Sequence, residues 1–183
     1  MVLHTLANGE SGMQKHVVFS EAITRKYPEQ VVLVTTRSRE GKANVMAVGW
    51  VTIASGEPPM FVLGIDDGAY TYELIRQTGE FVVAFPSEQM AGQTLFAGTH
   101  SGRNKDKFAE AAIDVQEGVA VKAPLIREAV ANFECKLVQV VQPGDCPLVI
   151  GQVVAAHVNE DETARRLYTL AKGYVLGGVR PDR

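Results

Sequence analysis

Three runs of strand-forming residues follow one another early in the chain with only short polar connections between them, and this spacing limits the available folds. Val31 to Thr36 is β-branched almost throughout, Asn44 to Ser55 forms a second long run, and Met60 to Ile65 forms a third. Gly41 lies in the first connection, and Gly56-Glu57-Pro58-Pro59 makes the second. Because parallel neighbours need a long crossover connection, these runs indicate antiparallel pairing.

Helix and strand signals continue along the rest of the chain. We predict helices over 20–26 with Ser20 as N-cap and Pro28 as stop, over 70–77 with Gly79 as stop, once or twice within 87–112 with breaks near Gly98 and Gly102, and over 161–170. We predict further strands over 81–85, 130–141 and 148–158, the last two joined by the turn at 142–145, and Gly177-Gly178 loosens the end.

About six strands with short inserted helices favour one β-barrel domain over residues 1–183, with its core at about 20–160. The strands have near-continuous apolar character, which suits a barrel covered on the outside by helices or by a second subunit. A parallel α/β sheet does not fit, because the strands come in directly connected pairs and no glycine fingerprint follows the first strand.

Composition excludes several classes of protein. The 46% hydrophobic and 21% charged residues are ordinary for a globular protein, and a net charge of -3 gives no basic footprint for nucleic acid. No run approaches the roughly 18 apolar residues of a membrane helix, and the stretch through Gln14 lacks the apolar core of a signal peptide. Cys135 and Cys146 are too few for a disulfide framework. We therefore expect a cytoplasmic protein with free thiols and no membrane contact.

No common catalytic or metal-binding motif is present in the sequence. There is no GxxxxGK[ST], HExxH, GxSxG or CxxC, and the four histidines are scattered, so we expect no metal site. His157 ends an apolar strand and is typical of a satisfied structural residue. Composition and periodicity alone reach no further than a soluble β-rich domain.

A set of ordered local matches over roughly Pro28 to Gly151 resembles the flavin reductase-like family, which includes flavoredoxins and the reductase partners of flavin-dependent monooxygenases. The matching segments are 31–36, 41–50, Pro58-Pro59, Ala69-Tyr70-Thr71, 78–83, Asp106-Lys107-Phe108, 133–136, Gly144-Asp145 and 150–153. The resemblance implies a mainly β, antiparallel six-stranded split barrel of Greek-key type with short peripheral helices. It also implies a homodimer with FMN bound near the subunit interface.

FMN needs a cation for its phosphate, polar donors for its ribityl chain and a flat apolar surface for its ring. The resemblance favours Lys107 as the cation, Thr71 at a helix start as a phosphate donor, and Asn44 as a partner for the flavin edge. The ordinary alternatives are a solvated lysine, a helix N-cap and a turn asparagine. The further candidates are Trp50 beside the ring or filling the core, Val45, Met46, Ala47 and Val48 along the ring, and Ser101 and Gly102 near the phosphate.

One position departs from the family pattern. Many relatives carry histidine after Gly144-Asp145, where this chain has Cys146. A thiol is a poorer hydrogen-bond partner and carries no charge near neutrality unless its pKa is lowered. We expect flavin binding to survive, with Cys146 either an inert small residue or a redox-active thiol near the flavin, and no other catalytic residue is assigned.

Three functions remain open at this point. The first is an NAD(P)H:FMN oxidoreductase, in which NADH or NADPH passes a hydride to FMN and a monooxygenase or another acceptor takes the electrons. The second is a flavoredoxin-like electron carrier with little nicotinamide oxidation of its own. The third is a non-enzymatic barrel that stores or senses a flavin.

Overall fold

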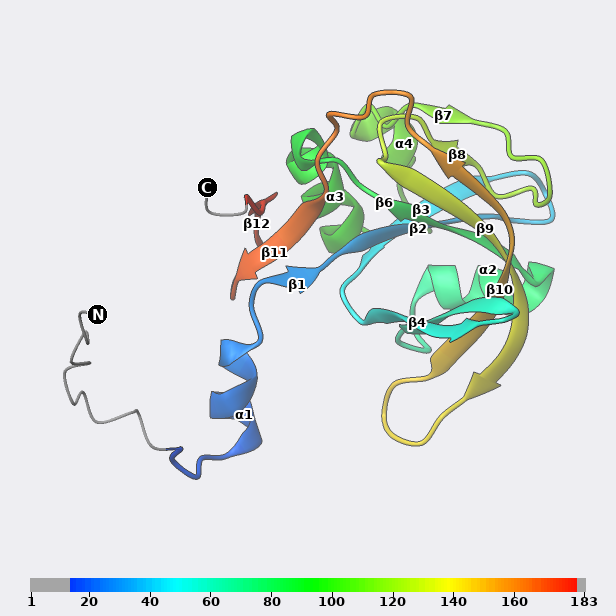
Figure 1. Ribbon diagram of the computed structural model, residues 1–183. Coiled ribbons are helices and arrows are strands. Elements are labelled where there is room, and N and C mark those ends of the chain that lie inside the picture. Colours follow the sequence, from blue (N-terminus) through cyan, green and yellow to red (C-terminus); the bar gives the residue numbers. More distant parts are fainter. Residues whose placement is uncertain (1–13, 181–183) are drawn as a thin grey trace, which may run out of the picture.

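The computed structural model describes residues 14–180 and is built around one curved antiparallel sheet of seven strands (Figure 1). In spatial order these strands are β3 (Ala43–Val48), β2 (Val32–Arg37), β6 (Glu80–Phe85), β9 (Ala131–Val141), β10 (Leu148–Val158), β5 (Pro59–Gly64) and β4 (Val51–Gly56). All pairings in this sheet are antiparallel, as the short connections predicted.

Two smaller sheets and a few short helices complete the described part of the chain. The small sheets are β1 (Glu29–Gln30), β11 (Leu167–Ala171) and β12 (Val175–Gly178) in the order β1-β11-β12, and the pair β7 (Val115–Gln116) and β8 (Leu125–Ile126). The helices are α1 (Phe19–Ala22), α2 (Tyr70–Thr78), α3 (Ala91–Thr99) and α4 (Lys107–Glu110), with 3₁₀ turns η1 (Ile23–Arg25) and η2 (Glu88–Met90).

The central strands are buried on both faces, which explains their near-continuous apolar sequences. Successive side chains of a strand point to opposite faces. Val32 and Val34 of β2 therefore enter one core cluster with Ile75 of α2, while Leu33 enters a second cluster with Ala97 of α3. Figure 1 shows α2 and α3 on opposite sides of β2, β3 and β6.

The mainly β, antiparallel fold is confirmed, although the main sheet has seven strands where six were expected. The predicted run 44–55 divides into β3 and β4 at Gly49 and Trp50, which belong to neither strand. This corner separates the two edge strands of the sheet, because β3 and β4 stand at opposite ends of the strand order.

The prediction of a helix over 161–170 is wrong, and the C-terminal region adds strands instead. Leu167 and Thr169 are buried while their neighbours are more exposed, which is the two-residue alternation of a strand. The strand β11 pairs with β1 and β12, and Gly177-Gly178 lies within β12 rather than in a loose end. The ordered fold therefore extends beyond the predicted core at 20–160.

The helix boundaries also differ from the predictions. The predicted helix over 20–26 is α1 followed by η1, and the N-cap position is Val18, so the Ser20 side chain caps nothing. Gly98 lies inside α3 instead of ending it, because the missing side chain lets the helix approach β3: a Cβ there would be 3.2 Å from the Ala47 Cβ. The stop at Gly79 is confirmed, with φ 72°.

Within residues 14–180, no helix has the length and apolar character required to cross a bilayer. The prediction about a leader concerns the stretch through Gln14, and nearly all of it lies outside the described residues.

Candidate functional site

A cavity of about 340 Å³ lies between β3, the start of α2 and the segment that joins α3 to α4. We call it the polar cavity. Six of the predicted cofactor residues line it: Asn44, Met46, Thr71, Ser101, Gly102 and Lys107. Residues 27 to 63 positions apart in the sequence are thus brought to one place by the pairing of β3 with β2 and by the helices at either side of this edge.

Asn44 is the buried polar centre of this cavity. Its side-chain amide donates to the Thr71 hydroxyl at 2.9 Å and to the Thr36 hydroxyl at 3.3 Å. Its Oδ1 is buried without a hydrogen-bond partner in the described part of the chain. Gly102 packs directly on this oxygen, and a Cβ at Gly102 would be 2.0 Å from it. A side chain at position 102 would therefore displace Asn44 or the loop.

The hydrogen bond from Asn44 replaces the N-cap role considered for Thr71. Thr71 is the second residue of α2, and the N-cap position is Ala69, whose side chain caps nothing. The Thr71 hydroxyl is instead an acceptor inside the cavity, and the residue is buried.

Lys107 begins α4 and is only 4% exposed, so it is not the solvated lysine of the ordinary alternative. Its ammonium donates to the backbone oxygens of Ala97 and His100, each at 2.9 Å. These oxygens belong to the C-terminal end of α3, where a cation is favoured by the helix dipole. An ammonium has three donors, and two are used in this way.

Lys107 has no carboxylate within ion-pair distance among residues 14–180. Burial without a counter-ion lowers the pKa of Lys107 to about 8. An anion in the polar cavity would restore the charged form, since an opposite charge favours ionisation.

Further cations surround the loop that carries Gly102. Lys42 donates to the Gly102 backbone oxygen at 2.8 Å. The Arg103 guanidinium lies 4.9 Å from the centre of the Tyr70 ring and forms an ion pair with Glu73 at 2.8 Å. The mouth of the polar cavity is therefore basic, although the chain as a whole has a net charge of -3.

The predicted β3 residues divide between the two faces of the sheet. Asn44 and Met46 line the polar cavity. Val45 is buried in the core beneath α3, and Val48 is buried in the other core cluster. Ala47 lines a second cavity, described below. Of these four apolar candidates, Met46 and Ala47 have side chains on cavity walls, whereas Val45 and Val48 present only their backbone to a ligand.

Trp50 and Cys146 lie apart from the polar cavity. Trp50 is 59% exposed and packs on Gly64, where a Cβ would be 3.0 Å from the indole Cε3 and 3.6 Å from the Cys146 sulfur. Trp50 therefore neither fills the core nor lines either cavity. Burial and three nearby aspartates, Asp145, Asp66 and Asp67, raise the pKa of the Cys146 thiol.

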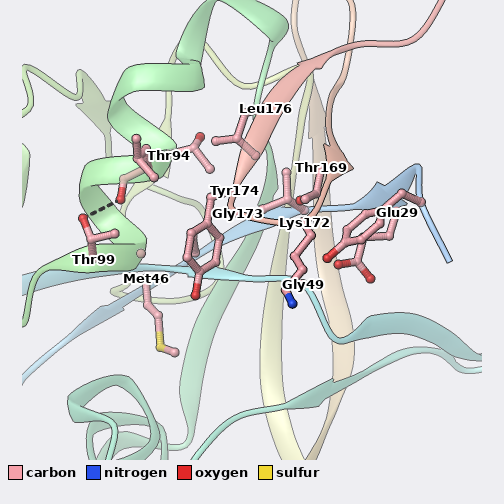
Figure 2. Close-up of a pocket in the computed structure, with 15 residues that line it drawn as sticks. Glu29, Met46, Gly49, Thr94, Thr99, Thr169, Lys172, Gly173, Tyr174 and Leu176 are labelled. Atoms are coloured by element: carbon pink, nitrogen blue, oxygen red, sulfur yellow. Dashed lines mark hydrogen bonds between the residues drawn. The ribbon is translucent and has the colours of Figure 1, made fainter. Parts of the chain in front are cut away.

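A second cavity, of about 610 Å³, adjoins the polar cavity and shares Met46, Gly98 and Thr99 with it (Figure 2). We call it the larger cavity. Sequence reasoning missed most of its wall, which includes Tyr27, Thr94, Lys172 and Tyr174. The last two lie on the turn between β11 and β12, and a region predicted as helix gave no sign of that turn.

Comparison with known protein families matches residues 24–176 to the Flavin reductase like domain. The chain belongs to this family. The match spans most of the chain and includes every residue of the polar cavity.

Individual relatives and solved structures agree with the family. An uncharacterized protein of Archaeoglobus fulgidus is 36% identical over 128 residues, covering 70% of this chain and 71% of the relative. A flavin reductase of Pseudomonas putida is 29% identical, covering 80% and 83%. The flavoredoxin of Desulfovibrio vulgaris (Miyazaki F) superposes with a TM-score of 0.81 at 26% identity, covering 93% and 96%. The FMN-binding domain of a flavin reductases-like enzyme from Shewanella baltica superposes with a TM-score of 0.72 at 26% identity, covering 85% and 88%. The split barrel of the flavin reductase-like family is therefore the fold of this chain.

Proposed function

We propose that this protein binds FMN in the polar cavity and acts as an NAD(P)H-dependent flavin reductase. The observation that carries this proposal is Lys107, a buried cation without a carboxylate partner among the described residues, on the wall of a cavity whose other buried polar group, Asn44, has an unsatisfied oxygen. Perturbed charged groups that line a cavity are typical of functional sites.

The chemistry of FMN fits what this cavity leaves unsatisfied. A phosphate dianion would supply the missing counter-charge of Lys107, and the Ser101 hydroxyl lies on the same wall. The flavin edge contains an N–H group, which is the kind of donor that Asn44 Oδ1 lacks. When bound, FMN supplies the ability to accept a hydride and to return electrons to an acceptor.

In this proposal the chain's own residues bind and orient. Lys107 fixes the end of α3 through two backbone oxygens and keeps one donor for the phosphate. Lys42 fixes Gly102 and so holds the loop closed over Asn44. Cys146 stays protonated at neutral pH because its pKa is raised, which supports an inert role over a redox-active one.

The relatives favour a reductase and keep one alternative in view. The flavin reductase of Pseudomonas putida supports turnover with NADH or NADPH as the hydride donor. The flavoredoxin of Desulfovibrio vulgaris supports a carrier of electrons with the same fold. Both functions need FMN in the polar cavity, and they differ in whether a nicotinamide donor reduces it.

We also propose that two copies associate, with FMN near their interface, and that a monooxygenase or another electron acceptor takes the electrons in the cytoplasm. Exposed apolar side chains support an association: Phe19 is 78% exposed and Ile53 is 72% exposed. Light scattering coupled to gel filtration tests this proposal, and a monomer at micromolar concentration would contradict it.

The test of FMN binding is a titration of the purified protein followed by flavin fluorescence and absorbance. Saturable binding at one FMN per chain is expected, and Gly102→Ala is expected to weaken it at least tenfold because the new Cβ overlaps Asn44 Oδ1. Gly92→Ala is the matched control, since a Cβ at Gly92 has no neighbour within 4 Å. A wild-type protein that takes up no FMN would refute the proposal.

Turnover is then measured as NADH and NADPH oxidation by the FMN-loaded protein with excess free FMN. Steady consumption is expected from a reductase. Bound flavin that is reduced by dithionite but by neither nicotinamide would favour the electron carrier.

A further inference from the structure

The larger cavity has walls from four parts of the chain that the sequence keeps far apart. They are the segment that leads into β1, the strand β3, the helix α3 and the turn between β11 and β12. Figure 2 shows Thr94 and Thr99 on α3, with Tyr174 and Lys172 reaching the same space from the opposite side. At about 610 Å³ the cavity is within the range that holds small organic ligands.

One buried polar group on this wall lacks a partner. Thr94 is 1% exposed, and its hydroxyl makes no hydrogen bond in the described part of the chain. Thr99, on the same helix and the same wall, donates its hydroxyl to the Leu95 backbone oxygen at 2.8 Å, the bond drawn in Figure 2. Buried hydroxyls are normally paired, so the Thr94 hydroxyl marks a place for a ligand atom that accepts or donates a hydrogen bond.

The charge on the wall is also uneven. Glu29 is already paired with Lys26 at 2.6 Å. Lys172 has no carboxylate within ion-pair distance among residues 14–180. The ammonium of Lys172 is therefore the unpaired charge of the cavity, and it favours an anionic ligand over a neutral or cationic one.

The remaining wall is apolar and aromatic. Met46, Val31 and Leu176 contribute aliphatic surface, and Tyr27 and Tyr174 contribute rings. Tyr174 is 71% exposed and has a φ of 61°, a conformation that a bulky residue adopts rarely. Figure 2 shows its ring with Met46 on one side and Lys172 on the other. An exposed ring in this position offers a face on which a flat ligand stacks.

We infer that the larger cavity binds a flat aromatic molecule with one negative charge, whose ring packs on Tyr174, whose anionic group meets Lys172 and whose second polar group meets Thr94. Because the cavity shares Met46, Gly98 and Thr99 with the polar cavity, such a molecule would lie next to the flavin. Its role as a reaction partner of the flavin rests on the proposed function, whereas its binding does not.

The test is calorimetric titration with 4-hydroxybenzoate, and with neutral 4-hydroxybenzamide as the charge control. Both are titrated into the protein with and without saturating FMN. We expect one 4-hydroxybenzoate per chain in both states, with the amide at least fivefold weaker. Lys172→Met should weaken the acid at least fivefold and leave the amide within twofold. Thr94→Val, which removes the hydroxyl without changing the shape of the side chain, should weaken both compounds. Lys136→Met, at an exposed position on β9, is the matched control and should change neither affinity.

The outcomes separate this inference from the proposed function. FMN uptake without any 4-hydroxybenzoate binding overturns the inference alone. Binding of the acid without FMN uptake supports the inference and overturns the proposed function alone. If FMN displaces the acid, the larger cavity is part of the flavin site and the inference is wrong. An equal loss for acid and amide in Lys172→Met also overturns it, because the charge would then play no part.

Discussion

Lys107 and Glu134 are the two charged side chains buried within residues 14–180, and their surroundings differ sharply. The Glu134 carboxylate accepts hydrogen bonds from the backbone N–H groups of Val119, Ala120 and Val121, at 2.7 to 2.9 Å, and pairs with His157 at 2.7 Å. Lys107 donates to two backbone oxygens and has no oppositely charged neighbour in that range.

The two pKa values show what this difference means. Burial alone would raise the pKa of Glu134, but the backbone N–H groups and His157 outweigh it, and the pKa is lowered. Burial of Lys107 is not offset, and its pKa falls to about 8. Glu134 is a complete structural anchor for the loop at 119–121, whereas Lys107 is an incomplete one that lines a cavity. The buried charge left without a partner is the one that indicates a binding site.

The largest expected effect comes from breaking the complete anchor. Glu134→Gln turns one acceptor into a donor that faces backbone N–H groups, and we expect the free energy of unfolding to fall by about 3 kcal/mol. Chemical denaturation followed by circular dichroism measures this change. FMN affinity of the folded protein should stay within twofold, and a loss of affinity at unchanged stability would contradict the separation of the two regions.

Lys107→Met tests the incomplete anchor. We expect FMN affinity to fall about tenfold or more, because a charge-assisted hydrogen bond is worth about 1.5–3 kcal/mol. Stability should change by about 1 kcal/mol at most, since the lost bonds to Ala97 and His100 are offset by removal of a buried charge. Lys107→Arg is the control that keeps the charge. Full FMN affinity in Lys107→Met would remove this residue from the site.

The pH dependence distinguishes the same two groups. FMN affinity of the wild type should fall between about pH 7 and 9, as the Lys107 ammonium loses its proton near pH 8 while the FMN phosphate, with a second pKa of about 6, stays ionised. The Lys107→Met protein should show a flat profile in this range. Flavin fluorescence titrations at each pH provide the measurement, and identical slopes in the two proteins would contradict the assignment.

Stability should depend on pH in opposite ranges for the two residues. The folded pKa of Lys107 lies below its unfolded value of about 10.4, so the cost of burying its charge is present below pH 8 and is relieved as the pH rises toward 10.4. The folded pKa of Glu134 is lowered, so its stabilising contribution is present above the unfolded pKa and is lost as the pH falls below it. Thermal unfolding of wild type, Lys107→Met and Glu134→Gln against pH should show each difference only in its own range.

The smallest expected effect concerns Trp50. Because it lies outside both cavities, Trp50→Phe should change FMN affinity by less than twofold. A larger loss in the titration would mean that the exposed indole contacts the flavin after all, as the family resemblance predicted.

The sequence predicted the sheet well because its strands are connected by short turns and buried on both faces. The residues of the polar cavity were also accessible, since Asn44, Thr71 and Lys107 stand in segments that match the family. Their roles were not, because a sequence does not show that Asn44 bonds to Thr71 or that Lys107 points back to α3. Burial of Lys107 was invisible for the same reason.

The larger cavity escaped prediction because of one wrong element. Leu167 to Leu170 reads as helical when no partner strand is known, and its pairing with β1 joins residues more than 130 positions apart. Trp50 was misplaced because a lone tryptophan after a strand usually packs inward, while here Gly49 and Trp50 form the corner between the two edge strands.

The most direct test of the central claim compares FMN with riboflavin, which lacks the phosphate, in wild type and in Lys107→Met. If Lys107 supplies the cation of a phosphate site, the wild type binds FMN at least tenfold more tightly than riboflavin, and Lys107→Met loses most of this preference while its riboflavin affinity changes little. Equal affinities of the wild type for the two flavins, or an unchanged preference in Lys107→Met, would contradict the account.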